Sequence, residues 1–79
     1  MRIICIRFPK PDGTHTYWIG TDAEAMRKDG ESFGGDPARG EVMDMDRVEA
    51  EWPDDCDIQD FYRGRDAAQR GCKSYSLNR

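Results

Sequence analysis

The first twenty residues alternate between apolar and polar side chains with a period of two. This alternation predicts two strands, over residues 2–8 and 15–20, because successive side chains of a strand point to opposite faces of a sheet. The intervening residues 9–14 include two prolines and a glycine, which are typical of turns. The chain is therefore predicted to begin with a β-hairpin.

The two alternations also predict how these strands pair. With the turn centred near Pro11–Asp12, Ile6 lies opposite Tyr17 and Ile4 lies opposite Ile19. One face of the hairpin is then apolar and consists of Ile4, Ile6, Phe8, Tyr17 and Ile19. We expect this face to contact the core.

A first helix is predicted over about residues 22–29. Thr21 and Glu24 have the spacing of a capping box, in which Thr21 is the N-cap and Glu24 reaches back to its amide. Gly30 is placed to end this helix, since glycine readily adopts the left-handed conformation found after helix ends.

The middle of the chain has a mixed pattern. Residues 31–40 are rich in glycine and predict a surface loop, which Phe33 would attach to the core. Helical spacing is shown by Val42, Met45, Val48 and Trp52. Strand-like alternation is shown by Val48, Ala50 and Trp52. We expect a strand near 41–46 and a second extended segment near 48–52, with a helix as the alternative.

A second helix is predicted to end at about Arg70, and any of the aspartates at positions 54, 55 and 57 can cap its start. Acids lie near its beginning and arginines toward its end, as the helix dipole favours. Its apolar face consists of Ile58, Phe61, Tyr62, Ala68 and Cys72. Gly71 closes it, and residues 74–77 can add an edge strand.

These elements predict an α+β fold with one domain over residues 1–79. The sheet is small and antiparallel, made of the N-terminal hairpin and one or two further strands. Two helices are expected to pack on one of its faces.

Charge adds a feature that the hydrophobic pattern does not show. The net charge of −4 is unevenly distributed: residues 1–40 hold six acids and six bases, residues 41–60 hold nine acids and only Arg47, and residues 61–79 hold one acid and five bases. We call residues 41–60 the acidic segment; its formal charge is −8.

The acidic segment is predicted to bind a basic macromolecular partner. Concentrating like charges costs self-repulsion, which a basic surface relieves. Trp52 lies among these acids and is a residue type enriched at binding hot spots. The predicted partner-binding residues are Asp44, Asp46, Glu49, Glu51, Trp52, Asp54, Asp55, Asp57 and Asp60. The alternatives are a solvated acidic face that caps the following helix, and packing of Trp52 in the core.

Signs of catalysis and of metal binding are weak. The one histidine, His15, faces Phe8 in the predicted register while Cys5 faces Trp18, so His15 and Cys5 lie on opposite faces and form no dyad. The cysteines are too far apart for a zinc site, and residues 54–60 lack the glycine and distal glutamate of a calcium loop. We expect no enzymatic activity, no metal and no cofactor.

The sequence also predicts where the protein resides. Its longest apolar run, Ile3–Ile6, is far shorter than the roughly 20 residues of a membrane span, and no signal-peptide pattern is present. Three widely spaced cysteines are typical of reduced thiols. We expect a cytoplasmic protein, without membrane association, that is a monomer or a weak homodimer.

In its length, acidity, lack of catalytic motifs and acidic stretch Glu41–Asp60, the chain resembles the small phage-encoded anti-CRISPR proteins. The resemblance implies an inhibitor that mimics DNA and occupies the basic DNA-binding surface of a type I surveillance complex, with type I-C as the closest association. These proteins share no motif, so the resemblance assigns no role to any single residue.

Two other functions remain open from the sequence. Nucleic acid could bind the C-terminal part, where Arg63, Arg65, Arg70, Lys73 and Arg79 alternate with Phe61, Tyr62 and Tyr75. Against this stand a pI near 4.8 and the adjacent acidic segment, which repel a polyanion, so direct nucleic-acid binding is not expected. The chain could also be a regulatory subunit with a protein partner and no mimicry.

Overall fold

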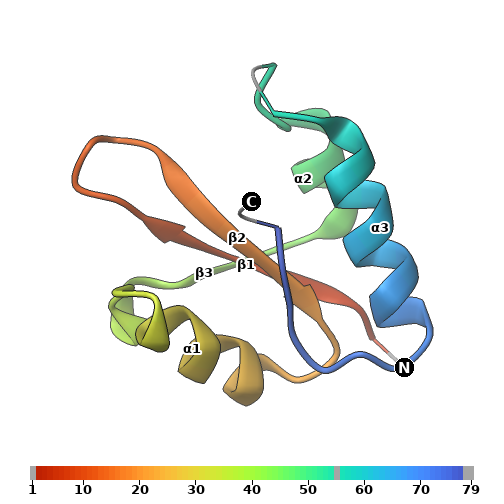
Figure 1. Cartoon of the computed structure of the whole chain (residues 1–79), viewed down its shortest axis with the longest axis horizontal. Helices are drawn as coiled ribbons and strands as arrows, with labels where there is room; N and C mark the ends of the chain where they lie inside the picture. The colour runs from red at the N-terminus through yellow and green to blue at the C-terminus, as the bar shows by residue number, and fades with distance from the viewer. Residues whose placement is uncertain (1, 55, 78–79) are drawn as a thin grey trace.

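A computed structural model describes residues 2–54 and 56–77 of the chain. In chain order the elements are β1 (Ile4–Pro9), β2 (His15–Gly20), α1 (Ala23–Ser32), the 3₁₀ helix η1 (Pro37–Arg39), β3 (Glu41–Met43), α2 (Met45–Ala50), α3 (Ile58–Gln69) and β4 (Tyr75–Ser76). The strands form one antiparallel sheet in the order β3-β1-β2-β4 (Figure 1). The predicted α+β class and the N-terminal hairpin are confirmed.

The register of the hairpin differs from the prediction by one residue. Ile6 pairs with Trp18 rather than Tyr17, and Cys5 pairs with Ile19. The cause is the loop, which has three residues between the paired Lys10 and Thr14 rather than two: the Lys10 amide donates to the Thr14 carbonyl at 2.8 Å. Within it the glycine at position 13 adopts a φ of +88°, the conformation that a three-residue hairpin loop requires.

This register places His15 and Cys5 on the same face of the sheet, which corrects the prediction of opposite faces. The two residues still do not meet. Cys5 pairs with Ile19, and four residues of strand, about 13 Å, separate Ile19 from His15. A Cys-His dyad is therefore absent from this sheet.

The two faces of the sheet carry separate cores. On one face the buried residues are Ile6, Phe8, Trp18 and Met26 of α1. On the other they are Cys5, Ile19, Met43, Val48, Phe61, Ala68 and Leu77. The two helices predicted from the sequence thus lie on opposite sides of the sheet, and α2 joins α3 on its side (Figure 1). The apolar run Ile3–Ile6 in the sequence accounts for this, since a strand buried on both faces needs apolar residues at successive positions.

Helix α1 begins one residue later than predicted and ends later as well. Its N-cap is Asp22 rather than Thr21, and the Asp22 carboxylate accepts from the amides of Glu24 and Ala25 at 3.0 and 3.2 Å. Gly30 does not end the helix but lies buried inside it, where a Cβ would come within 2.5 Å of the Phe8 ring. Glycine is needed there for close packing of α1 on the sheet.

The expected anchoring of Phe33 is wrong. The Phe33 side chain is 77% exposed, and its ring lies beside the buried Trp18 with ring centroids 5.4 Å apart, so it covers the core from outside rather than inserting into it. The glycine-rich segment around it forms a loop that includes η1, capped by Asp36.

Residues 41–52 contain both a strand and a helix. The predicted first strand exists but ends at Met43, and the predicted extended segment near 48–52 is wrong, because α2 occupies Met45–Ala50. Asp44 caps α2 through its side chain, which accepts from the Asp46 amide at 3.0 Å. Packing of Val48 in the core then favours the helical alternative that the sequence left open.

The C-terminal elements follow the prediction. Asp57 is the cap of α3 among the aspartates proposed, and it accepts from the Gln59 amide at 2.9 Å. Gly71 follows the helix at a φ of +97°. The short strand β4 then pairs with β2 as an edge strand. Of the helices described here, none has the length and apolar character needed to cross a bilayer.

Candidate partner-binding site

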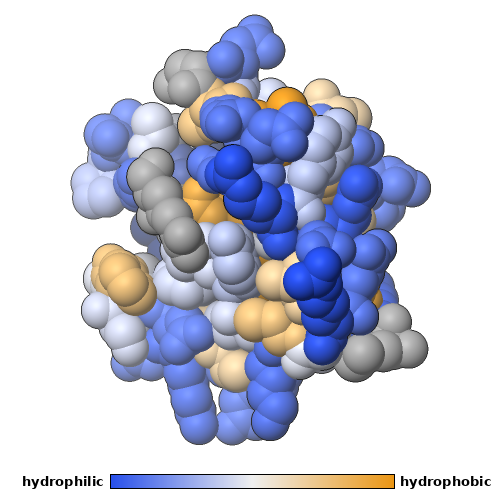
Figure 2. Space-filling view, turned by 45° about the vertical axis from the view of Figure 1, so that its right-hand side comes forward, coloured by the Kyte–Doolittle hydropathy of each residue, from blue (hydrophilic) through white to orange (hydrophobic). Residues whose placement is uncertain are grey.

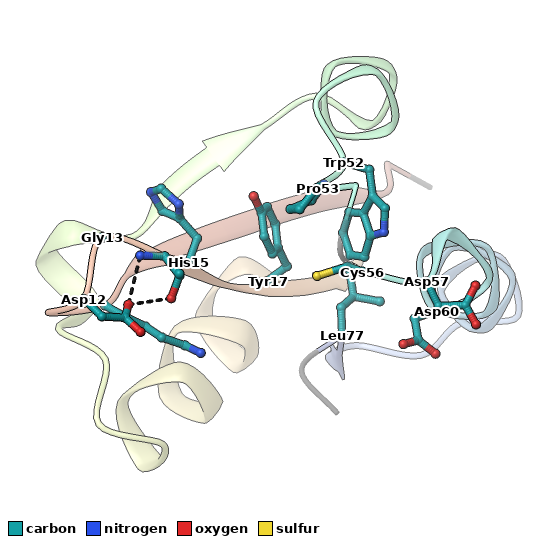
Figure 3. Close-up of a pocket in the computed structure, with 12 residues that line it drawn as sticks. Asp12, Gly13, His15, Tyr17, Trp52, Pro53, Cys56, Asp57, Asp60 and Leu77 are labelled. Atoms are coloured by element: carbon teal, nitrogen blue, oxygen red, sulfur yellow. Dashed lines mark hydrogen bonds between the residues drawn. The ribbon is translucent and has the colours of Figure 1, made fainter.

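A groove of about 870 Å³ lies beside β2, between the hairpin loop and the segment that connects α2 to α3. Figure 3 shows Tyr17, Pro53 and Trp52 next to one another along it, with Leu77 beneath them. Two carboxylates, those of Asp57 and Asp60, lie at the α3 end. The remaining lining residues are Lys10, Asp12, Gly13, Thr14, His15 and Cys56.

The aromatic side chains of the groove are continuous with the core. Trp52 is half-buried, and its ring lies 5.2 Å from that of Tyr17 and 5.6 Å from that of Phe61. Its indole Nε1 is buried without a hydrogen-bond partner among the described residues. Trp52 packs against the core, as the alternative from the sequence predicted, and it also lines the groove.

The carboxylates at the α3 end are held in place by local contacts. One oxygen of Asp57 accepts from the Gln59 amide as the helix cap. One oxygen of Asp60 accepts from Arg63 at 2.9 Å. Each side chain is thus oriented by one oxygen, and its second oxygen is free of any hydrogen bond with the described residues.

A row of polar side chains crosses the sheet beside the groove. Tyr17 pairs with Arg7, and Arg7 pairs with Glu41 of β3. The Arg7 guanidinium lies 2.6 Å from the Glu41 carboxylate, and this hydrogen bond lowers the pKa of Glu41 below its usual range. Burial raises the pKa of the Tyr17 hydroxyl, and a hydrogen bond that Arg7 donates to its oxygen partly offsets the increase. Tyr17 therefore stays protonated at neutral pH.

The acidic segment is only partly available to a partner. Internal arginines contact three of the predicted carboxylates: Glu49 with Arg65 at 3.7 Å, Glu51 with Arg47 at 3.1 Å, and Asp60 with Arg63. The two helix caps, Asp44 and Asp57, are exposed. Asp46 and Asp54 are exposed and have no ion pair among the described residues. Asp55 lies outside the described residues.

The structure brings some of the predicted residues together and separates others. Trp52, Asp57 and Asp60 line the groove. A second, adjoining cavity of about 510 Å³ shares Trp52 and Asp57 and adds Glu49 and Asp54. Neither cavity is lined by Asp44, Asp46 or Glu51, which belong to α2 and its ends.

Sequence reasoning missed Tyr17, Leu77 and the hairpin loop as parts of this site. The loop sequence, which sets the hairpin register, was the feature from which Tyr17 could have been assigned to the site. The Pro11-Asp12-Gly13 sequence is typical of a three-residue loop with glycine in the left-handed conformation, and that loop places Tyr17 on the α3 side of the sheet.

Three of the four C-terminal cations within the described residues are engaged within the chain, and Arg79 lies outside those residues. Arg63, Arg65 and Arg70 each contact a carboxylate, and Arg65 also lies 5.0 Å from the ring of Tyr62. Phe61 is fully buried and unavailable for stacking on a base. These contacts weigh against nucleic-acid binding by this part of the chain.

The chemistry within reach of the groove is limited. Burial raises the pKa of the Cys5 thiol to about 12, so this thiol stays protonated and is not a nucleophile. Cys56 is exposed at the groove. Within residues 2–54 and 56–77, no group of three or more His, Cys, Asp and Glu side chains is arranged to hold a metal ion.

The side of the molecule that carries α3 is mainly hydrophilic, with small and scattered apolar areas (Figure 2). Comparison with protein-family models, with curated proteins and with solved structures finds no match for this chain.

Proposed function

We propose that this protein is a non-enzymatic inhibitor that binds a basic surface of a macromolecular partner through its acidic segment. The observation that carries the proposal is the arrangement around the connection between α2 and α3. Asp46 and Asp54 are exposed, have no ion pair among the described residues and lie close in sequence to Trp52, which borders a groove.

The paired carboxylates define the limits of this surface. Because arginines already contact Glu49, Glu51 and Asp60, these side chains contribute less to attraction of a partner than their formal charge suggests. The unpaired carboxylates keep their full charge. Self-repulsion among them is relieved when a basic surface approaches, which favours association and increases its rate.

For the partner, we propose the DNA-binding surface of a type I CRISPR surveillance complex, with type I-C as the first to test. Support comes from the resemblance in length and acidity to phage-encoded inhibitors, and from the chemistry of such a surface, which is basic because it receives DNA. The protein would then act in the cytoplasm, as a monomer or weak homodimer, by occupying that surface as a DNA mimic.

The test is competition between this protein and target DNA for the purified type I-C complex. We expect the wild-type protein to displace DNA, and the double variant Asp46→Lys/Asp54→Lys to lose at least tenfold in inhibitory potency. The matched control is Glu24→Lys/Glu31→Lys, which makes the same change in charge on the exposed side of α1. Equal loss in both variants would show a net-charge effect and refute a localised surface.

A mobility-shift assay with DNA alone distinguishes the competing function. We expect no retardation of DNA by this protein at any salt concentration. Retardation that weakens as salt increases would instead indicate direct nucleic-acid binding and would overturn the mimic.

A further inference from the structure

The groove beside β2 has the chemistry of a receptor for one cationic side chain. We infer that it binds an arginine of the basic partner, with the guanidinium against Trp52 and Tyr17 and directed to Asp57 and Asp60. This inference rests on the proposed function, because it identifies the contact that the acidic surface makes.

The walls of the groove suit the two ends of an arginine. Leu77, at 5% exposure, and Pro53 provide apolar surface for the aliphatic part of the side chain. Tyr17 and Trp52, with ring centroids 5.2 Å apart, provide aromatic surface beside it (Figure 3). A guanidinium stacks well on such rings.

The charge at the α3 end is complementary to a cation. Asp57 is the N-cap of α3 and Asp60 lies three residues later in its first turn, the spacing of the N-cap and N3 positions, whose side chains are close to one another. Each uses one oxygen in a local contact and keeps the other. Two acceptors at the end of an aromatic groove match a planar group with several N–H donors, which favours arginine over lysine.

The chain itself contains an example of the same contact nearby. The Arg65 guanidinium lies 5.0 Å from the ring centroid of Tyr62 and 5.7 Å from that of Phe61, while it also pairs with Glu49. An internal arginine on α3 is thus held by aromatic rings and a carboxylate. The groove offers the same combination of groups to an arginine from outside.

The test uses two short peptides, acetyl-Gly-Arg-Gly-amide and acetyl-Gly-Lys-Gly-amide, titrated into the folded protein and followed by NMR. We expect the arginine peptide to shift the indole N–H resonance of Trp52 and the amides of Asp57 and Asp60. The indole of Trp18, buried on the opposite face, is the internal reference and is expected to stay unchanged. Binding of the lysine peptide should be at least threefold weaker.

A pair of variants tests the role of the carboxylates. Asp57→Ser/Asp60→Asn removes both charges, and serine retains the ability to cap α3. We expect its affinity for the arginine peptide to decrease about fivefold to tenfold, as for the loss of two exposed charge contacts. The control Glu24→Gln/Glu31→Gln removes the same charge on the α1 side of the molecule, away from the groove, and should change the affinity less than twofold.

Each result separates this inference from the proposed function. Absence of shifts at Trp52, or equal binding of the lysine peptide, overturns the arginine site. If Asp57→Ser/Asp60→Asn inhibits the surveillance complex as well as wild type while Asp46→Lys/Asp54→Lys does not, the acidic surface stands and the groove contact is refuted. If neither variant nor wild type displaces DNA while the peptide binds, the groove site stands and the proposed partner is refuted.

Discussion

The two faces of the sheet are covered by different numbers of helices, α1 on one face and α2 with α3 on the other, and they are closed in different ways. On the first, α1 lies so close to β1 that Gly30 contacts the Phe8 ring, and four buried residues complete a small core. On the second, α2 and α3 cover a core of seven buried residues, and the connection between them leaves a groove beside β2. The helix α1, packed directly on the sheet, closes the first face. The helices α2 and α3 leave an opening on the second.

The two sides of the molecule also differ in charge. The chain up to residue 40 balances its acids and bases, while the acidic segment lies on the side that carries the groove. In this protein the more open face is therefore also the more charged one. The following predictions test whether the first face supports only the fold while the second also forms the binding site.

Removal of one buried aromatic ring from each face should give the largest effects. Phe8→Ala and Phe61→Ala should each lower the free energy of unfolding by about 3–5 kcal/mol, because both side chains are fully buried and truncation leaves a cavity. Chemical denaturation measures the loss. Sulfate, which favours burial of apolar surface, can keep the variants folded for the measurement.

The two truncations should differ in which tryptophan they disturb. Phe61→Ala removes the ring beside Trp52, whereas Phe8 belongs to the core that contains Trp18. NMR of the two indole N–H groups reports each environment separately. Equal disturbance of both indoles by both variants would show that the two cores are not independent.

The close approach of α1 should make Gly30 intolerant of a methyl group. An alanine normally stabilises a helix interior by about 1 kcal/mol relative to glycine. At Gly30 its Cβ would lie 2.5 Å from the Phe8 ring, so we expect Gly30→Ala to destabilise by about 1–3 kcal/mol. Gly64→Ala in α3 would meet methyl groups of Leu77 and Ile19 at 2.5 and 2.6 Å and the Tyr75 ring only at 3.2 Å. Because its closest contacts are methyl groups rather than a ring, we expect the smaller loss there. A thermal melt that ranks Gly64→Ala as the more damaging change would contradict this account.

The helix caps should have smaller effects, and α1 should depend on its cap more strongly. Asp22 accepts from two amides and Asp57 from one. Replacing either by alanine should cost about 1 kcal/mol, with Asp22→Ala the more costly. Denaturant titration of both variants, with the serine variants as controls that restore the cap, provides the measurement. Equal losses in the alanine and serine variants would exclude capping as the cause.

The smallest effect should come from the ion pair between Arg7 and Glu41. The folded pKa of Glu41 is lowered, so its contribution to stability is present above the ordinary glutamate pKa of about 4.3 and is lost as pH falls through the folded value. Glu41→Gln should therefore melt below wild type at pH 7 and at the same temperature at pH 2.5. A difference in melting temperature that persists at the lower pH would show that the pair is not its source.

Much of the fold follows from local features of the sequence. The hairpin strands, an aspartate cap for α3 among three candidates, and the edge strand β4 could be predicted because alternation, capping residues and glycine act over a few neighbouring positions. The α2 helix could not be predicted, since Met45–Ala50 fits two periods and only the burial of Val48 distinguishes them.

The candidate site could be predicted only in part for the same reason. Trp52, Asp57 and Asp60 are drawn from the acidic segment that composition identified. Two of its carboxylates, Glu51 and Asp60, pair with arginines three or four positions away, but the partner of Glu49 is distant in sequence. Arg65 reaches Glu49 across sixteen positions of the chain, and no local pattern predicts that contact. The prediction treated nine residues alike, whereas ion pairing makes them unequal.

By itself, the sequence determined the two hairpin strands, the C-terminal end of α3 and the concentration of negative charge, because these depend on near neighbours and on composition. The register of the hairpin depends on the local loop, whereas only the tertiary structure decided the distribution of helices over both faces and the groove between Tyr17 and Trp52. A single residue in the loop sets which side chains share a face, since side chains of a strand alternate with a period of two. Tyr17 reaches the groove for that reason.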